Sequence, residues 1–198
     1  MIDPDRAQAI VRAVLASVPW PVSVKMRLGW KQKTECLDFA PRMEQAGADL
    51  LIIHGRTRDQ AYAGTADWNA IAQAKIKVTI PVIANGDITD VPSALNVLEV
   101  TKADGIAIAR GALGNPWVFT KIFAAHNNKT IPVISPEEWK QTMLQHLLWH
   151  QERYGDPAVV TFRKHLSCYL KGFPGAKELR QRLLSITDIT LLQTELTH

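Results

Sequence analysis

Four stretches of this sequence end an apolar run with charged or amide side chains, which are the groups that bind anionic or carbonyl-bearing ligands. The stretches end, in chain order, with Lys25 and Arg27, with His54 and Arg56, with Asn85-Gly86-Asp87, and with Arg110-Gly111. The run "ADLLII", for example, comes directly before His54. In α/β proteins, ligands bind outside the carboxyl ends of the strands. The agreement of four strand ends therefore predicts one ligand site.

The first two stretches each allow a structural interpretation beside the chemical one. Alternation in "VSVKMR" places Lys25 and Arg27 on the same face of a strand. Lys25 is then either a solvated residue at a strand end or a donor to an anionic or carbonyl-bearing ring. A lone histidine such as His54 is more often a structural hydrogen-bonding group than a catalyst. Residue type alone does not choose between these alternatives.

Glycines accompany the other two stretches. Asn85-Gly86 is a common hairpin dipeptide, but here it stands between an expected strand and an expected helix. That position favours a site where a ligand approaches the backbone closely. Arg110 and Gly111, with Gly114 in the same loop, suit a phosphate group because a guanidinium and backbone N–H groups bind phosphate. Glycines are common in loops, so this second indication is weak by itself.

The elements that must position these groups alternate between helices and strands. Apolar, β-rich runs begin near Val22, Leu50, Val82 and Gly105. Helical patterns occupy residues 3–18, 34–47, 67–77 and 90–100. Nearly continuous apolar strands are typical of parallel strands that are covered on both faces. The order predicts an α/β architecture, either a (β/α) barrel or a doubly wound sheet.

From about residue 130 the pattern becomes helical. A long amphipathic helix is expected over residues 135–155, and two more helices are expected within 157–186. No further strand pattern follows. The sequence therefore predicts two domains, an α/β domain over residues 1–129, which the resemblance described below implies is a partial barrel, and a helical domain over residues 130–198.

The composition of the 198 residues sets bounds on the class of protein. Hydrophobic residues are 46% and charged residues 21%, as in soluble globular proteins, and the net charge of +4 is compatible with a polyanionic partner without establishing one. Cys36 and Cys168 have neither pairing nor metal-binding spacing, so no disulfide framework and no metal site are expected. A protein without a disulfide framework is typical of a reducing compartment, so a cytoplasmic location is expected. No apolar run is long enough to span a bilayer, so no membrane partner is expected.

Five stretches, taken together and in this order, resemble the bacterial tRNA-dihydrouridine synthases. They are "VKMRLGW", "HGRTRDQAYAGTADW", "IPVIANGDI", "ADGIAIARGALGNPWVF" and "RKHLSCYLKGFPGAKELR". The resemblance runs across nearly the entire chain. It implies a (β/α)8 TIM barrel that binds FMN, followed by a helical domain that binds tRNA. The implied activity is the FMN-dependent reduction of uridine to 5,6-dihydrouridine in tRNA, with NADPH as electron donor.

The resemblance also implies roles for the candidate residues. Lys25 and His54 would contact the flavin and the target base, as the catalytic residues of this chain. FMN would be bound by these two residues together with Asn85, Gly86, Asp87, Ala109 and Arg110. The RNA substrate would be contacted by Arg27, Arg56, Tyr62, Arg163, Lys164 and Lys171.

One part of the family pattern is not matched. A (β/α)8 barrel needs about 250 residues, whereas four βα units precede the helical domain here. The family places four further strands upstream, with a "GCP"-type loop whose cysteine protonates the uracil, and neither Cys36 nor Cys168 matches that cysteine. The chain is therefore expected to be the second half of the barrel, with little or no activity alone. Its exposed barrel edges are expected to pair with a separate N-terminal half or with a second copy.

Two other functions stay open at this point. One is a non-catalytic RNA-binding remnant, which the unmatched cysteine favours. The other is an FMN barrel oxidoreductase that acts on a small pyrimidine. The basic helical region and the segment ending in Trp68 argue against this second function. Without the resemblance, a solvated basic face on a small helical bundle is the preferred explanation of the basic residues after residue 130.

Overall fold

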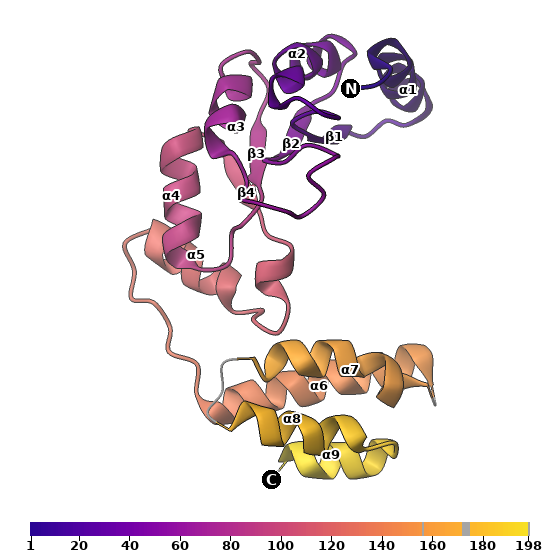
Figure 1. Cartoon of the computed structure of the whole chain (residues 1–198), viewed down its shortest axis with the longest axis vertical. Helices are drawn as coiled ribbons and strands as arrows, with labels where there is room; N and C mark the ends of the chain where they lie inside the picture. Colours follow the sequence, from indigo (N-terminus) through magenta and orange to yellow (C-terminus); the bar gives the residue numbers. More distant parts are fainter. Residues whose placement is uncertain (156, 172–174, 198) are drawn as a thin grey trace. The chain divides into compact units, whose positions relative to one another are not determined.

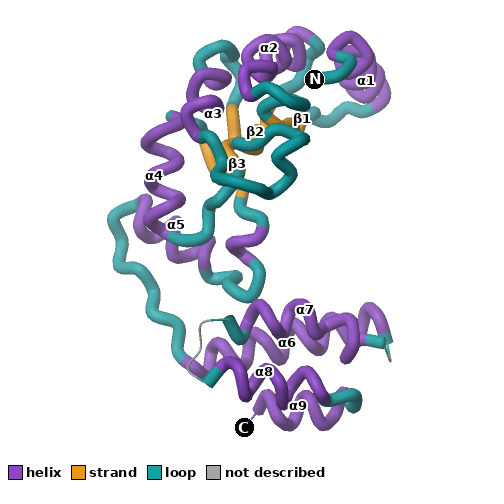
Figure 2. The backbone as a smooth tube through the Cα atoms, in the orientation of Figure 1, coloured by secondary structure: helices purple, strands orange, loops and turns teal. Residues whose placement is uncertain are grey.

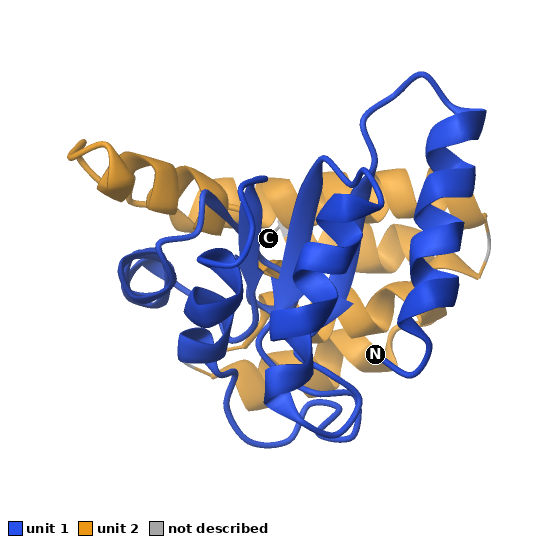
Figure 3. Cartoon of the chain, turned by 90° about the horizontal axis from the view of Figure 1, so that it is seen from above, with its two compact units in different colours: residues 1–111 blue, residues 112–198 orange. Residues whose placement is uncertain are grey.

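The computed structural model of the chain describes residues 1–155, 157–171 and 175–197 (Figure 1). Contacts between residues divide the chain into two compact units, Met1–Gly111 and Ala112–His198 (Figure 3). The domain boundary expected after residue 129 stays a prediction. None of the helices in the described ranges is both long enough and apolar enough to cross a membrane.

The first unit contains a parallel sheet, whose strands are orange in Figure 2, and its spatial order follows the sequence, β1-β2-β3-β4. Its strands are β1 (Ser23–Arg27), β2 (Leu50–His54), β3 (Val82–Asn85) and β4 (Gly105–Ala107). All four begin at, or next to, the positions where the apolar runs of the sequence begin. The predicted α/β class with parallel strands is confirmed.

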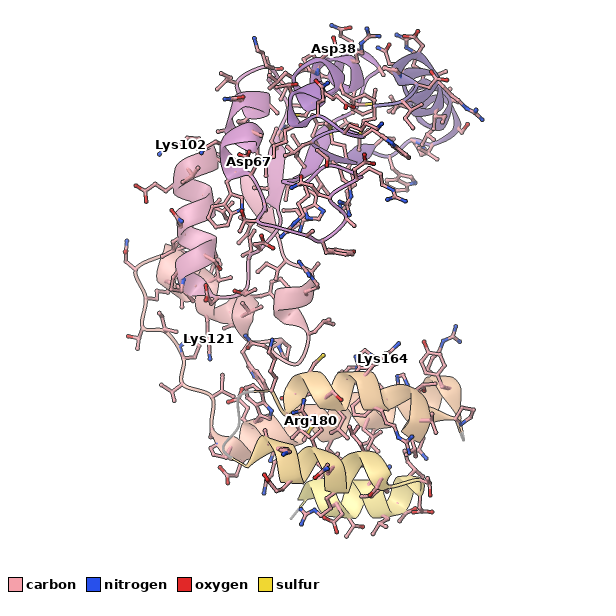
Figure 4. The ribbon with its side chains drawn as sticks, viewed as in Figure 1. Asp38, Asp67, Lys102, Lys121, Lys164 and Arg180 are labelled. Carbon is pink, nitrogen blue, oxygen red and sulfur yellow. The ribbon has the colours of Figure 1, made fainter. Side chains whose placement is uncertain are left out.

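Helices precede or connect these strands. They are α1 (Pro4–Ser17), α2 (Cys36–Gln45), α3 (Trp68–Lys75) and α4 (Val91–Thr101), with the short 3-10 helix η1 (Lys33–Glu35) before α2; a second 3-10 helix, η2 (Arg110–Ala112), follows β4. Helices α1, α3 and α4 start after Asp3, Asp67 and Asp90, whose carboxylates accept a hydrogen bond from a backbone N–H of the first turn. Figure 4 labels Asp67 at the start of α3. Local capping therefore fixes where the loops that follow β2 and β3 end.

The two faces of the sheet have different compositions. On one face the side chains are apolar and buried, namely Met26, Leu51, Ile53, Val82 and Ala84. Helices α2, α3 and α4 lie on one side of the sheet and contribute the buried Phe39, Met43, Ile71 and Val97 to the core (Figure 1). Alternate residues point to the opposite face, where strand register aligns Lys25 with Ile52 and Arg27 with His54. The candidate polar residues therefore share the face that does not hold the buried apolar residues.

Helix α1 and strand β1 border an open groove of about 780 Å³. Its lining includes Ile10 and Val14 from α1, and Val24 and Met26 from β1. Val11 is the buried apolar residue of α1, while Ile10 is 56% exposed and Val14 41% exposed. Strand β1 is also an end strand of the sheet.

The second unit is helical in its described parts. Its helices are α5 (Val118–His126), α6 (Pro136–Tyr154), α7 (Ala158–Tyr169), α8 (Ala176–Ser185) and α9 (Ile189–Thr197). A core that includes Leu147, Phe162, Leu166, Leu183 and Leu192 holds α6 to α9 together. The three helices expected between residues 135 and 186 are confirmed, with α8 starting after the undescribed residues 172–174. Helices α5 and α9 were not predicted.

Candidate functional site

Three candidate residues lie side by side at the carboxyl ends of neighbouring strands. The register pairs Arg27 of β1 with His54 of β2, and His54 with Asn85 of β3. Residues paired in this way point to the same face of a sheet. Lys25 lies two residues earlier on that face, and its side chain is exposed. The structure thus brings Lys25, Arg27, His54 and Asn85 together because the strands are parallel and in register.

The Arg56 side chain, two residues after His54, is buried, with only 2% exposed. Its guanidinium donates to the carbonyl oxygens of Ala63 at 3.2 Å and Gly64 at 2.6 Å, and to Oδ2 of Asp87 at 2.7 Å. A buried charge is tolerated when it is paired and its donors are used, and both conditions are met here. These bonds tie the loop that follows β2 to the residue that follows β3. The expected contact between Arg56 and RNA has no support in this geometry.

Asp87 connects three loops. Its Oδ2 also accepts the backbone N–H of Ala66 at 2.7 Å, and its Oδ1 lies 3.5 Å from Nη2 of Arg110. Burial by itself would raise the pKa of this carboxyl, but the Ala66 N–H, Arg56 and Arg110 outweigh burial and lower the pKa below its ordinary value. Asp87 is therefore an anion at neutral pH and holds the loops after β2, β3 and β4 by one carboxylate.

His54 is neutral at physiological pH. The side chain is buried, and burial first, then the charges of Arg27, Lys25 and Arg56, lower the pKa of its imidazole to about 4, with Asp87 acting in the opposite sense. Arg56 Nη1 lies 3.5 Å from His54 Nε2. A neutral imidazole offers one hydrogen-bond donor and one acceptor rather than a positive charge.

Tyr62 is the exposed aromatic residue of this region, with 62% of its surface accessible. Its ring lies 4.7 Å from the Arg110 guanidinium carbon and 5.7 Å from that of Arg27, and its centroid is 6.4 Å from the His54 ring. Arg27 is fixed by hydrogen bonds of 2.8 Å to the carbonyl oxygens of Thr57 and Ala61. An exposed ring flanked by cations is a surface on which a planar, electron-rich group can stack.

The backbone at Asn85-Gly86-Asp87 is not a hairpin. The segment joins β3 to α4, and Gly86 has a φ of +119°. A Cβ at Gly86 would lie 2.8 Å from the Ala66 Cβ and 3.0 Å from the His54 Cδ2, so only glycine fits. The Asn85 side chain donates to the Ala107 carbonyl at 2.7 Å, and the Trp68 indole N–H donates to the Gly86 carbonyl at 3.0 Å. The hairpin interpretation is wrong, because the following strand β4 pairs in parallel with β3.

The remaining candidates divide between the two units. Ala109 is exposed, and the Arg110 side chain is 57% exposed, so both are accessible beside Asp87. Arg163, Lys164 and Lys171 belong to the second unit, with Lys164 on α7 (Figure 4). Arg163 donates to the Ile186 carbonyl at 3.3 Å within that unit. Their contact with RNA stays a prediction.

Neither cysteine belongs to the group of residues at the strand ends. Cys36 begins α2, is buried, and donates from its Sγ to the Lys33 carbonyl at 3.1 Å. Burial raises the pKa of its thiol to about 11, so it is an unreactive thiol at neutral pH. Cys168 lies on α7 in the second unit. Among the residues that the structure describes, no cluster of histidine, cysteine, aspartate and glutamate is arranged to bind a metal ion.

The backbone partners of the site were not found by sequence reasoning. The carbonyl oxygens of Ala63 and Gly64 and the N–H of Ala66 complete the contacts of Arg56 and Asp87. The one signal in the sequence is Gly64, which has a φ of +63° and lets the loop turn back toward the sheet. Backbone groups carry no residue type, so their part in a site depends on the fold.

The chain has clear relatives. The family described as dihydrouridine synthase (Dus) matches residues 1–197. "Probable tRNA-dihydrouridine synthase 1" of Synechocystis sp. is 44% identical over 191 residues, which cover 94% of this chain and 53% of that protein. "Probable tRNA-dihydrouridine synthase" of Rhodobacter capsulatus is 40% identical over 95% of this chain and 58% of its own length. "tRNA-dihydrouridine synthase B" of Pseudomonas syringae pv. tomato is 41% identical, over 90% and 54%.

The chain spans little more than half the length of these curated relatives. The match nevertheless covers almost every residue of this chain, including the strands, the loops with the candidate residues and the helical unit. The chain belongs to the dihydrouridine synthase family.

Proposed function

We propose that this chain forms part of an enzyme that reduces uridine to 5,6-dihydrouridine in tRNA with FMN as cofactor. The observation that carries the proposal is the group formed by Lys25, Arg27, His54 and Asn85 at one edge of a parallel sheet, with Arg110 held beside it by Asp87. Membership of the family supports the reaction, and the names of the relatives support tRNA as the substrate.

The residues at the strand ends fit a flavin phosphate. FMN needs a cation for its phosphate, a backbone that allows close approach, and polar groups for its ring. Arg110 offers an accessible guanidinium, whereas the space left by the missing Cβ of Gly86 is filled by Ala66 and His54. Lys25 supplies an exposed ammonium, and His54 supplies a neutral ring. FMN, when bound, supplies the hydride for the C5–C6 bond of the uracil.

In this proposal each residue has a physical task. Asn85, Gly86, Asp87, Ala109 and Arg110 would hold the ribityl and phosphate parts of the cofactor, with Asp87 holding Arg110 and not contacting the phosphate. Lys25 and His54 face its ring and the target base, where the ammonium of Lys25 favours negative charge that develops on a carbonyl oxygen. Arg27 and Tyr62 contact the RNA. Hydrogen bonds to the carbonyl oxygens of Thr57 and Ala61 hold Arg27 in place for this contact. Tyr62 is exposed between two guanidinium groups and offers its ring for stacking. The base must leave its stack to reach this edge of the sheet.

The larger architecture is also a proposal. Four parallel strands in sequential order, with polar residues at their carboxyl ends, support a sheet that is the second half of a (β/α)8 barrel. The helical region over residues 130–198 would contact tRNA through Arg163, Lys164 and Lys171. The proton for the uracil would come from a residue outside this chain, since neither Cys36, which is buried, nor Cys168 matches the cysteine of the family pattern. NADPH as electron donor and a cytoplasmic location rest on the resemblance alone.

Flavin binding by the purified chain tests the proposal. Titration with FMN is expected to quench flavin fluorescence saturably. Replacing Arg110 with alanine (Arg110→Ala) is expected to raise the Kd for FMN about 10- to 100-fold, because a hydrogen bond to a charged group contributes about 1.5–3 kcal/mol. Arg58→Ala is the matched control, since Arg58 is an exposed arginine that packs on Trp30.

The reaction itself is measured on tRNA that contains no dihydrouridine. The chain, alone and together with the N-terminal half of a relative, is supplied with FMN and NADPH, and nucleoside mass spectrometry detects dihydrouridine. Little product is expected from the chain alone, and more with the added half. Saturable binding of tRNA without any binding of FMN would instead favour an RNA-binding protein without catalysis and would contradict the proposal.

A further inference from the structure

The His54 imidazole has one ring edge turned into the protein. Its Nε2 lies 3.5 Å from Arg56 Nη1, and its Cδ2 is the atom that a Cβ at Gly86 would approach to 3.0 Å. We propose that Arg56 and Asp87 are positioning residues that hold His54 as the neutral tautomer with its proton on Nδ1, so that Nδ1–H is the donor offered to a ligand carbonyl. The ligand part of this inference rests on the proposed function.

The first step concerns the atom that faces Nε2. A guanidinium has N–H donors and no acceptor, and it stays protonated in proteins. The nitrogen that faces it is therefore favoured as an acceptor, which leaves the imidazole proton on the other nitrogen. The separation of 3.5 Å makes this a long hydrogen bond, but a full positive charge at that distance still favours a lone pair over an N–H.

The second step concerns the rigidity of the guanidinium. Arg56 cannot turn away from the ring, because Ala63, Gly64 and Asp87 accept its other N–H groups. Asp87 is itself held by the Ala66 N–H and by Arg110. The charge that orients His54 is thus fixed by five contacts from three different loops, and none depends on a ligand.

The third step concerns the free edge of the ring. Within the described ranges, no hydrogen bond is formed by His54 Nδ1, and the ring lies on the sheet face that also carries Lys25 and Arg27. Those two cations and Arg56 disfavour a second proton on the ring, and Asp87 is the one anion that opposes them. The imidazole therefore stays neutral and presents a single N–H. A carbonyl oxygen of a flavin or of a uracil is the complementary acceptor.

The wild-type chain tests the tautomer without flavin or RNA. The protein is labelled with 15N-histidine, and a long-range 1H–15N correlation spectrum at pH 7 shows which ring nitrogen carries the proton. His54→Gln assigns the signals. Nδ1–H is expected in about tenfold excess, the ratio that corresponds to a difference of about 1.4 kcal/mol. A ring that is mainly protonated on Nε2 overturns the proposal.

Variants test the role of the two positioning residues. In Arg56→Gln and in Asp87→Asn, the ratio of the Nδ1–H tautomer to the Nε2–H tautomer is expected to fall at least about threefold from its value in the unchanged protein. The dispersion of the backbone amide signals of the first unit, Met1–Gly111, reports whether that unit remains folded in each variant. Arg58→Gln, in the same loop, is expected to leave the tautomer unchanged. An unchanged tautomer in a folded Arg56→Gln variant rules out the positioning role.

Addition of FMN separates this inference from the proposed function. If FMN binds at this edge of the sheet, the His54 ring signals shift while the proton stays on Nδ1. If FMN leaves all ring signals unchanged, the proposed function fails, and the tautomer measured without flavin still decides whether Arg56 and Asp87 position the ring.

Discussion

At the scale of single residues, one carboxylate organises the charged groups of the site. Asp87 accepts from Arg56 and Ala66 and pairs with Arg110, so it neutralises a buried cation and holds an accessible one. Cations that lie close together at one edge of the sheet repel each other, and an anion between them offsets this repulsion. Asp87 lets the chain gather them without leaving the buried Arg56 uncompensated.

Removal of this anion should cost stability. Asp87→Asn leaves the Arg56 charge buried without its partner, and the free energy of unfolding is expected to fall by about 3 kcal/mol, the lower end of the range for a broken buried pair. The lower end applies because the Asp87 side chain is 30% exposed. Urea denaturation measures the loss. Asp59→Asn, at an exposed aspartate in the loop that follows β2, is the control and should change stability little.

The polar residues at the strand ends were predictable, whereas the burial of Arg56 was not. Position after an apolar run identifies His54, Asn85 and Arg110 from sequence alone. An arginine in a loop has the same appearance whether it meets a ligand or the protein interior. The 2% exposure of Arg56 follows from a loop that turns back at Gly64, and that path depends on tertiary contacts.

At the scale of elements, the helical unit contains a cluster of histidines. The ring of His146 lies 4.7 Å from that of His165 and 6.4 Å from that of His150. His146 also lies 3.1 Å from the Tyr169 hydroxyl, and His150 lies 2.7 Å from the Thr161 hydroxyl. Helices α6 and α7 are thus joined by imidazole rings that pack best when they are uncharged.

This packing makes the helical unit sensitive to acid. Burial, above all, lowers the pKa of His146, His150 and His165 below 6.5, and nearby positive charge contributes. The unfolded state then takes up protons at a higher pH than the folded state, so stability is present above pH 6.5 and is lost as the pH falls below it. Hydrogen exchange of the α6 and α7 amides at pH 7.5 and pH 5.5 should show faster opening at the lower pH.

The control for this prediction is a change in the histidines themselves. Replacement of all three by glutamine should remove most of the difference between the two pH values, while His126→Gln, at an exposed position, should not. Equal protection at both pH values in the unchanged protein would contradict the assignment of neutral rings to the folded state.

The strands and most helices were predictable because each carries its own signal. Continuous apolar runs mark β1 to β4, and aspartate caps mark α1, α3 and α4. Helices α5 and α9 were missed. Short helices depend on tertiary packing, and α9 is held to the helical core by Leu192 and Leu196. Such packing depends on the surface against which the helix lies, so it cannot be read from the sequence of the helix alone.

At the scale of the whole molecule, the groove beside α1 and β1 should make the isolated chain associate with itself. Sheet edges and apolar helix faces pair when they are left open. Sedimentation velocity is expected to show a concentration-dependent rise in mass. Ile10→Glu with Val14→Glu should reduce it, because both residues line the groove. Ile76→Glu, at an 80% exposed position outside the groove, is the control; a monomer at all concentrations would contradict the prediction.

The order of the sheet has a consequence for what completes it. Each strand lies next to its successor, and all four run in one direction. A strand that pairs in parallel with β1 places the loop that follows it near Lys25. A strand that pairs in parallel with β4 places the loop that follows it near Arg110. A segment that pairs with the sheet in this way would add its own residues to the proposed site, so two polypeptides could form that site together.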